Sequence, residues 1–224
     1  MSFYQKSPRQ TLEVLEATEA GLSSLQAKHR LDTYGPNAII VQGEPIWRRL
    51  VEPFANLMMG VLSIAVIISL MHHALFDAIV ILAIMLVSAT IFYVQRFSTE
   101  RILKSLQQKS SVKVDVLRDG KTIQLAAEKL VPGDIILIDE GEKIPADARL
   151  ISSSSLRIDE SQITGESMPV DKSIDELDGE REIYDQTCMV FQGSFVVSGE
   201  ATAVVVATGN KTEFGKLAEL SSQA

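Results

Sequence analysis

Residues 54–94 read FANLMMGVLSIAVIISLMHHALFDAIVILAIMLVSATIFYV and contain two long apolar runs. The first run, Phe54–Met71, has 18 residues and no charge, and the second, Leu75–Val94, has 20 residues and one charge, Asp77. At about 1.5 Å per residue, each run would as a helix cross most of a hydrocarbon core roughly 30 Å thick. The alternative, a buried helical hairpin in a soluble core, needs far more surrounding protein than this chain supplies. The stretch therefore predicts a two-helix transmembrane hairpin.

The charges around the two runs predict their orientation. Basic residues flank the runs on their outer sides: Arg48, Arg49, Arg96, Arg101 and Lys104. The connecting turn, residues 72–74, has neither Lys nor Arg, so both termini are expected in the cytoplasm of a multi-pass protein of the cell membrane. The adjacent His72 and His73 cannot close a metal coordination shell by themselves, which favours a plain interfacial turn. Asp77 is close enough to the helix start to stay hydrated, and a place in an ion pathway is the alternative.

The charge and cysteine content exclude some classes of function. Residues 97–224 carry 14 Lys and Arg against 22 Asp and Glu, which accounts for the whole net charge of −8. An acidic segment without a basic stripe argues against nucleic acid as a partner. Cys188 is the single cysteine, so the chain has no internal disulfide and no cysteine-based metal cluster. We expect Cys188 to be a buried apolar residue.

Two short helices are expected within residues 8–34. Ser7 and Ser23 are each followed three residues later by Gln, which is the pattern of a capping box. Gly35-Pro36 is a stop signal after the second helix, whose buried face is predicted to carry Leu25, Leu31 and Tyr34. A further helix, from Ser98 to about Gln108, should continue the second apolar run.

After residue 111 the apolar pattern changes to alternation, which predicts strands. The expected strands and turns are residues 112–117, a turn at 118–121, 123–125, a turn at 131–134, 135–138, 148–151, 156–158, 189–197 and 201–207, the last two joined at Ser198-Gly199. Seven or eight short strands favour a sandwich or jelly roll. Residues 171–185 are expected to be an exposed excursion, and Asn210 is expected to cap a short helix from about Thr212.

A polar loop, DESQITGESMP at residues 159–169, separates two predicted strands. Without other information it is a solvated loop, in which Glu160 has only a solvated or strand-end role. Gly165-Glu166-Ser167 is not a nucleophile elbow, because that motif needs glycine where this chain has Pro169. Gly209-Asn210-Lys211-Thr212 lacks the leading glycine and spacer of a phosphate-binding loop.

Within this loop, Thr164-Gly165-Glu166-Ser167 resembles the TGES signature of the actuator domain of P-type cation-transporting ATPases. Other blocks resemble the same family in the same order: Gly21-Leu22-Ser23, Tyr34-Gly35-Pro36-Asn37, Val131-Pro132-Gly133-Asp134, Ile144-Pro145-Ala146-Asp147, Phe191-Gln192-Gly193 and Thr208-Gly209-Asn210-Lys211-Thr212-Glu213-Phe214-Gly215. The resemblance thus covers nearly the whole chain, and an ordered set of this kind is highly specific.

The resemblance implies roles for the loop residues. Such pumps phosphorylate an Asp from ATP, change shape and hydrolyse the aspartyl phosphate, and Glu166 would orient or deprotonate the attacking water. Gly165 would let the backbone approach the phosphoryl group, and Thr164 and Ser167 would shape the loop. Mg²⁺ and ATP are implied for the full-length pump, with no cofactor or metal site in this chain. The implied partners are the lipid bilayer, the phosphorylation and nucleotide-binding domains of the same pump, and a cation bound mainly by later helices.

We interpret the chain as an α+β multi-domain membrane protein that is the N-terminal part of an ATP-driven cation pump. Residues 1–50 would be a cytoplasmic helical segment, 51–97 the transmembrane hairpin and 98–224 a distorted jelly-roll actuator domain. No DKTG-like phosphorylation motif occurs, so this chain alone is not expected to hydrolyse ATP. Calcium is the first candidate for the transported cation. The alternative is a non-catalytic, membrane-anchored binding or regulatory protein built on an actuator-like β domain.

Overall fold

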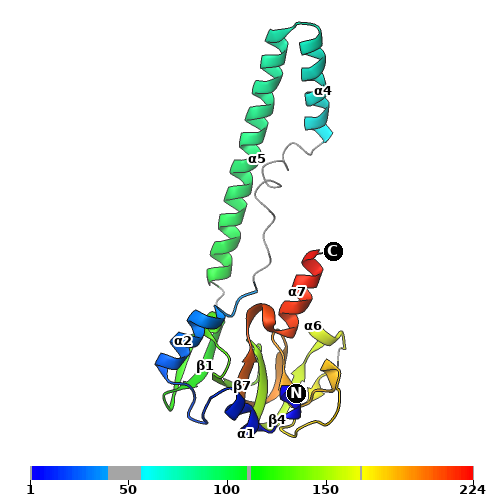
Figure 1. Ribbon diagram of the computed structural model, residues 1–224. Helices are drawn as coiled ribbons and strands as arrows, with labels where there is room; N and C mark the ends of the chain where they lie inside the picture. Colours follow the sequence, from blue (N-terminus) through cyan, green and yellow to red (C-terminus); the bar gives the residue numbers. More distant parts are fainter. Residues whose placement is uncertain (1, 40–56, 110–111, 167, 224) are drawn as a thin grey trace. The chain divides into compact units, whose positions relative to one another are not determined.

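The structure, a computed structural model, describes residues 2–39, 57–109, 112–166 and 168–223 (Figure 1). By its internal contacts the chain divides into two compact units, residues 1–41 with 111–224 and residues 42–110. The first unit contains short helices and an antiparallel sheet, and the second contains the two apolar helices. The α+β class is therefore confirmed.

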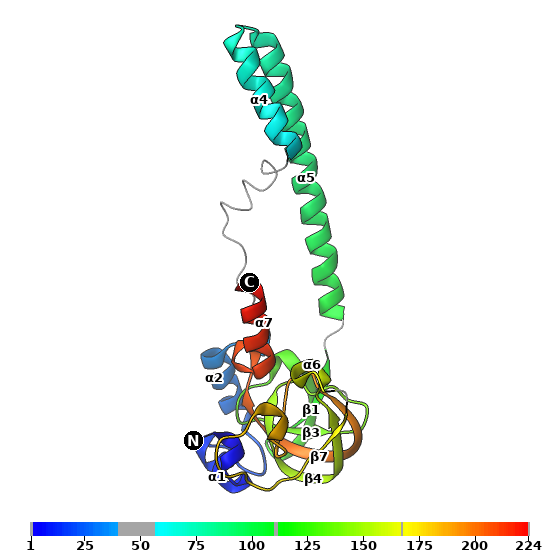
Figure 2. The same cartoon turned by 90° about the vertical axis from the view of Figure 1, so that its right-hand side faces the viewer.

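Seven strands form one antiparallel sheet in the order β2-β1-β3-β7-β4-β5, with β6 paired to β4. The central strands β1, β3, β7 and β4 are labelled in Figure 2. Their bounds are β1 Lys113–Arg118, β2 Lys121–Ala126, β3 Ile135–Ile138, β4 Asp147–Asp159, β5 Val170–Asp171, β6 Met189–Val190 and β7 Phe195–Ala207. The alternation expected in β1 is confirmed, since Val114 and Val116 are buried and Lys113 is exposed. β3 has the bounds that the sequence predicts.

Strand β4 is longer than the sequence predicts. Residues 148–151 and 156–158 were expected to be separate strands, but β4 is continuous through both. The prediction was wrong because β4 pairs with β7 along nearly its whole length, and the polar residues between the two segments are accommodated as register shifts. One of these shifts lies between Ser154 and Arg157.

Strand β7 differs from the prediction for the same reason. Ser198-Gly199 is not a turn but part of the strand, and residues 191–194 separate β7 from β6. Gly199 has a φ of +84°, and a Cβ atom there would lie 2.5 Å from the carbonyl oxygen of Ser154. Only glycine fits this backbone contact. The Ser198-Gly199 pair, which the sequence predicts to be a turn, is therefore an irregularity inside a continuous strand.

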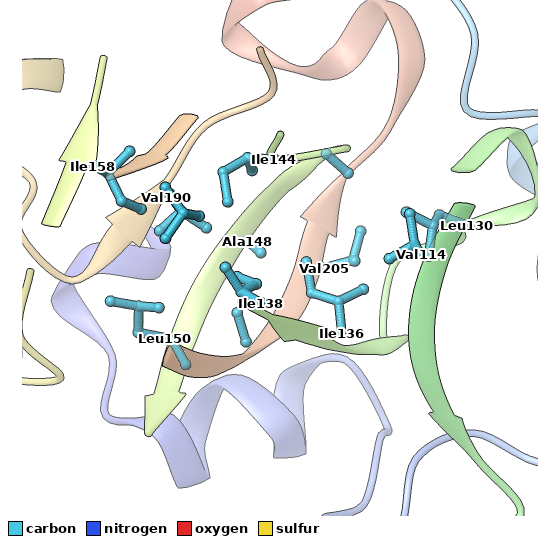
Figure 3. Close-up of a cluster of buried hydrophobic side chains, with 14 of the residues drawn as sticks. Val114, Leu130, Ile136, Ile138, Ile144, Ala148, Leu150, Ile158, Val190 and Val205 are labelled. Carbon is cyan, nitrogen blue, oxygen red and sulfur yellow. The ribbon is translucent and has the colours of Figure 1, made fainter. Parts of the chain in front are cut away.

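The core of the sheet unit is an aliphatic cluster drawn from β1, β3, β4, β6 and β7 (Figure 3). Its members that are completely inaccessible to solvent include Val116, Ile136, Ala148, Leu150 and Val205. Burial of each side chain favours the folded state by about 25 cal/mol for every Å² of apolar surface that is removed from water. The cluster therefore stabilises the central strands against one another.

Short helices surround the sheet. Their bounds are η1 Phe3–Gln5, α1 Pro8–Val14, α2 Ser24–Tyr34, η3 Ala127–Lys129, α6 Ser161–Thr164, η4 Ile183–Asp185, η5 Gly209–Lys211 and α7 Glu213–Gln223. Asn210 lies inside η5, so the prediction that it caps the last helix was wrong. Thr212 has that position instead, and its hydroxyl accepts a hydrogen bond from the Gly215 N–H (3.0 Å).

The two N-terminal helices begin as the sequence predicts. Ser7 and Ser23 each form a capping box, and Gly35 ends α2. The predicted buried face of α2 was partly wrong, because Leu25 and Tyr34 are 82% and 48% exposed. Ala27 is buried in α2, and Leu31 is partly buried beside it. The buried face of α2 is therefore narrower than the sequence predicts, because it includes Ala27 and Leu31 but not Leu25 or Tyr34.

Helices α4 (Leu57–Met71) and α5 (Leu75–Lys109) belong to the second unit, and α5 includes the helical continuation expected after residue 98. Among the described residues, one helix is both long and apolar enough to span a bilayer, namely α5 over Leu75–Gln95, with a mean hydropathy of 2.5. The apolar stretch of α4, Met58–Met71, is shorter. Only 17% of the α5 stretch is buried by other parts of the chain.

Asn37, which is 5% exposed, is one of the residues that join the N-terminal segment to the rest of the sheet unit. Its side-chain amide donates to the carbonyl oxygens of Ala127 (3.0 Å) and Pro145 (2.9 Å), and its Oδ1 accepts from the Gly209 N–H (2.8 Å). One side chain thus satisfies backbone groups from three separate parts of the sheet unit.

We predict that Asn37→Ala lowers the free energy of unfolding of this unit by about 2–3 kcal/mol, because buried backbone groups lose their partner. Urea denaturation in detergent micelles, followed by hydrogen exchange of β4 and β7, measures the change. Gln124→Ala is the control, since Gln124 makes an exposed hydrogen bond to Asp115 and should change stability by no more than about 0.5 kcal/mol. Equal effects of the two substitutions would contradict the role of Asn37.

Candidate functional site

The loop that contains the candidate residues leaves the sheet at the end of β4. The single-turn helix α6 begins after Glu160, whose carbonyl oxygen accepts hydrogen bonds from the N–H groups of Ile163 (2.9 Å) and Thr164 (3.0 Å). Gly165 ends the turn with φ +77° and ψ −4°, and its N–H donates to the Ser161 carbonyl (3.0 Å). This left-handed conformation favours glycine, and a Cβ at this position would meet nothing within 4 Å.

Thr164 links the helical turn to Glu166. Its hydroxyl donates to the Glu160 carbonyl oxygen (3.1 Å) and accepts from the Glu166 N–H (3.2 Å). Glu166 is exposed, so its carboxylate faces solvent from a turn whose backbone is held by Thr164. The structure thus brings Thr164, Gly165 and Glu166 together on one turn. Ser167, the fourth candidate residue, lies outside the described residues.

Asp159, at the end of β4, supports the start of this turn. Its Oδ1 accepts a hydrogen bond from the Ser161 N–H (2.9 Å). Hydrogen bonds from Ser161 hold the pKa of the Asp159 carboxyl below its usual value. The ionised carboxylate therefore remains available as an acceptor at neutral pH.

Glu160 directly follows the last residue of β4, so the strand-end role is confirmed, whereas the expectation that it is solvated was wrong. It is 1% exposed, and its Oε1 lies 2.6 Å from Nζ of Lys172, whose side chain is also buried. The contact is a close pair between a carboxylate and an ammonium group, both removed from solvent. Burial raises the pKa of Glu160 and lowers that of Lys172, while the charge of each partner opposes both shifts.

The turn is also attached to the protein by apolar contacts. Ile163 packs against a buried cluster that includes Cys188, Met189 and Phe191. Cys188 is fully buried, as expected from the sequence, and burial raises the pKa of its thiol. α6 therefore has one side on a packed cluster, while Glu166 beyond it stays exposed.

Three of the sequence blocks quoted above meet at the carboxylate of Asp147, which is 3% exposed. Its Oδ1 accepts from the Gln192 N–H and its Oδ2 from the Glu213 N–H, both at 2.8 Å. Gln192 in turn accepts a hydrogen bond from the Thr212 hydroxyl (2.7 Å). Burial outweighs these hydrogen bonds and raises the pKa of Asp147 to about 6. The first turn of α7 is thereby attached to the beginning of β4.

The described residues do not fit a Mg²⁺ site. Across residues 2–39, 57–109, 112–166 and 168–223, no group of three or more His, Cys, Asp or Glu side chains is placed to hold a metal ion. At the turn itself the Thr164 hydroxyl is already hydrogen-bonded, which leaves the Glu166 carboxylate as a lone ligand. Mg²⁺ requires near-octahedral oxygen coordination, which these groups do not provide.

Sequence reasoning missed the Glu160–Lys172 pair and the part played by Asp147. No sequence signal indicates the pair, because the two residues stand 12 positions apart with a turn and a strand between them. Asp147 was part of a quoted block, but only the fold brings the Gln192 and Glu213 amides to it.

Residues 108–222 match the family of P-type ATPase actuator domains, and residues 3–69 match the N-terminal region of cation transporters and ATPases. The chain belongs to the P-type cation-transporting ATPases. It is 38% identical to a calcium-transporting ATPase of Listeria monocytogenes and 35% identical to calcium-transporting ATPase 1 of Bacillus cereus, each over 100% of this chain and 26% of the relative. It is 36% identical to the cation-transporting ATPase pma1 of Synechocystis, over 89% of this chain and 22% of the relative.

This P-type ATPase chain therefore spans about a quarter of the length of the curated relatives it matches. The actuator-domain match includes the whole turn with Thr164, Gly165 and Glu166 as well as Asp147. The N-terminal match includes Asn37, which fastens that segment to the actuator domain.

We predict a pH dependence that originates at Asp147. The raised pKa means that the folded state binds this proton more tightly, so the stabilisation is complete below pH 3.8 and is lost as the pH rises through about 6. Between pH 4 and pH 7 the free energy of unfolding of the wild type should fall by about 2 kcal/mol relative to Asp147→Asn. Hydrogen exchange of β4 and β7, corrected for intrinsic rates, measures the difference. A difference that does not vary with pH would contradict the raised pKa.

Proposed function

We propose that this chain is part of an ATP-driven cation pump and that its actuator domain promotes hydrolysis of an aspartyl phosphate formed elsewhere in the pump. The observation that carries the proposal is the exposed Glu166 carboxylate on a turn held by Gly165 and Thr164, in a chain that belongs to the P-type ATPases. In this function the actuator domain also couples dephosphorylation to movement of the membrane helices.

Glu166 would orient or deprotonate the water that attacks the phosphate. A general base can do this only if its carboxylate comes within hydrogen-bond reach of the attacking water. Its backbone N–H is held by Thr164, and the space around Gly165 is open, which would allow a phosphoryl group to approach the turn. Thr164 and Ser167 would shape the turn, and neither would take part in proton transfer.

The remaining parts of the reaction would come from outside this chain. A carboxylate beside a phosphate is electrostatically unfavourable, and the nearby Lys172 is already paired with Glu160. Mg²⁺, bound with ATP by the phosphorylation and nucleotide-binding domains, would supply the compensating positive charge. Those domains are thus the proposed partners of the Glu166 turn.

The second unit is proposed to be a transmembrane hairpin formed by α4 and α5. Support comes from the apolar surface of α5, on which Leu75, Phe76 and Leu86 are 64%, 78% and 70% exposed. Such a continuous apolar surface is unfavourable in water and is suited to lipid. With this assignment, residues 1–50 are the proposed cytoplasmic helical segment, 51–97 the transmembrane hairpin and 98–224 the actuator domain. The bent sheet is the proposed jelly roll of that domain. Both termini are proposed to lie in the cytoplasm.

Calcium is the proposed transported cation, since relatives from Listeria and Bacillus bear that name. The first apolar run has no acidic residue, so the ion would be bound mainly by later helices. No observation on the described residues favours the alternative of a non-catalytic binding protein.

The function is tested with Glu166→Gln in the complete pump. Formation of the phosphoenzyme from ATP should proceed at the wild-type rate, whereas its decay in a chase should be slower by about 10²–10⁴-fold, because the basic carboxylate is lost. Glu160 is buried and cannot be the control, so the matched variant is Glu180→Gln, at an exposed residue of the excursion 171–185. Wild-type decay in Glu166→Gln would contradict the function.

The topology is tested by cysteine labelling in intact cells. A cysteine at His72 should react with a membrane-impermeant maleimide from outside, because the turn 72–74 is expected to face the exterior. Native Cys188 is too buried to report on its side of the membrane, so Glu176→Cys, at an exposed residue, serves as the inside marker. Outside labelling of Glu176→Cys would overturn the orientation.

A further inference from the structure

The Glu160–Lys172 pair closes the segment that carries Glu166. Glu160 is the first residue after β4, and Lys172 is the first residue after β5. β4 and β5 pair through Arg157 with Asp171 and Ile158 with Val170, so the pair stands beside the last rungs of this ladder. The chain between β4 and β5 therefore leaves and rejoins the sheet at this ladder, and a buried charge contact joins the two residues that flank the ladder.

Lys172 is held independently of Glu160. Its N–H donates to the Leu156 carbonyl (2.9 Å), its Nζ donates to the Gln186 carbonyl (3.4 Å), and the ammonium lies 5.7 Å from the centroid of the Phe191 ring. Glu160 is thereby paired with a cation whose position is set by three other parts of the chain.

Glu160 transmits this constraint to the functional turn through its backbone. Its carbonyl oxygen is the acceptor for the Ile163 and Thr164 N–H groups and for the Thr164 hydroxyl, and that hydroxyl accepts from the Glu166 N–H. A short path of contacts therefore runs from Lys172 through Glu160 and Thr164 to Glu166. A shift of the Glu160 side chain would displace the acceptor on which the turn is built.

Stability alone does not account for such a pair. Desolvation of two buried charges offsets most of their attraction, and apolar replacements of similar volume are often equally stable. Only Oε1 of the Glu160 carboxylate lies against the Lys172 ammonium, and the buried Oε2 has no donor among the described residues. A pair that contributes little stability but fixes one arrangement of two chain segments is suited to positioning.

We propose that Glu160 and Lys172 are positioning residues that hold the turn of residues 161–166 in the arrangement from which Glu166 acts. This inference rests on the proposed function of Glu166. The pair does not touch the reacting groups, so its contribution should appear only in the step that uses Glu166.

The test removes both charges together in the complete pump, with Glu160→Leu and Lys172→Met in one variant. Phosphoenzyme formation should match the wild type, and phosphoenzyme decay should be at least about 10-fold slower. Amide exchange at residues 163–165 should be at least about 10-fold faster, with exchange in β3 and β7 unchanged. If this variant does not fold, Glu160→Gln with Lys172→Met, which keeps the shape of Glu160, replaces it with the same expectations.

A mutant cycle that combines the double variant with Glu166→Gln, read out as the rate of phosphoenzyme decay, shows whether the pair acts through Glu166. If it does, adding Glu166→Gln to the double variant slows decay no further than Glu166→Gln alone, whereas independent effects would multiply and overturn the proposal. The positioning role would be overturned if the double variant kept the wild-type rate of phosphoenzyme decay or of amide exchange at residues 163–165. The proposed function would still stand in that case, provided that phosphoenzyme decay is slow in Glu166→Gln. Wild-type decay in Glu166→Gln itself would overturn both.

Discussion

The antiparallel pairing of β4 with β7 is the constraint on which the rest of the sheet unit depends. The two strands pair along nearly their whole length, β3 and β5 extend the sheet on either side, and β6 adds to β4. Register shifts bend the pair without interrupting it, and Gly199 permits a close backbone approach to Ser154. Because β4 ends at Asp159 and β5 pairs with its last residues, the segment between them must leave and re-enter the sheet at one place. That geometry produces a short, closed loop for Glu166.

Buried polar side chains determine how distant segments meet on this sheet. Asn37 satisfies backbone groups of three segments, and Asp147 accepts amides from the 191–194 segment and from the start of α7. Arg118 and Asp134 form a further two-bonded pair, at 2.8 and 2.6 Å, beside β1 and β3. A buried polar group without a partner is costly, so each contact favours one arrangement of the segments it joins. Asn37, Asp134 and Asp147 belong to the blocks quoted from the sequence, so several of those blocks supply structural contacts.

Two glutamates six residues apart, Glu160 and Glu166, show how far the environment decides the part a residue plays. Glu160 is buried against Lys172, and Glu166 is exposed beyond a glycine. The first residue can hold the loop but cannot meet another domain. The second can meet another domain but has no packing of its own to hold it. The division of tasks proposed here follows from that difference in burial.

The sequence by itself determined the local features of this protein: the capping boxes at Ser7 and Ser23, the apolar runs of α4 and α5, and the alternation of β1. Each depends on residues within a few positions of one another, where periodicity and backbone preference act directly. Only the tertiary structure decided that β4 and β7 are continuous, that Leu25 is exposed, and that Glu160 is buried against Lys172. These outcomes depend on which distant segments become neighbours, and pairing or burial by such neighbours overrides local turn and polarity signals.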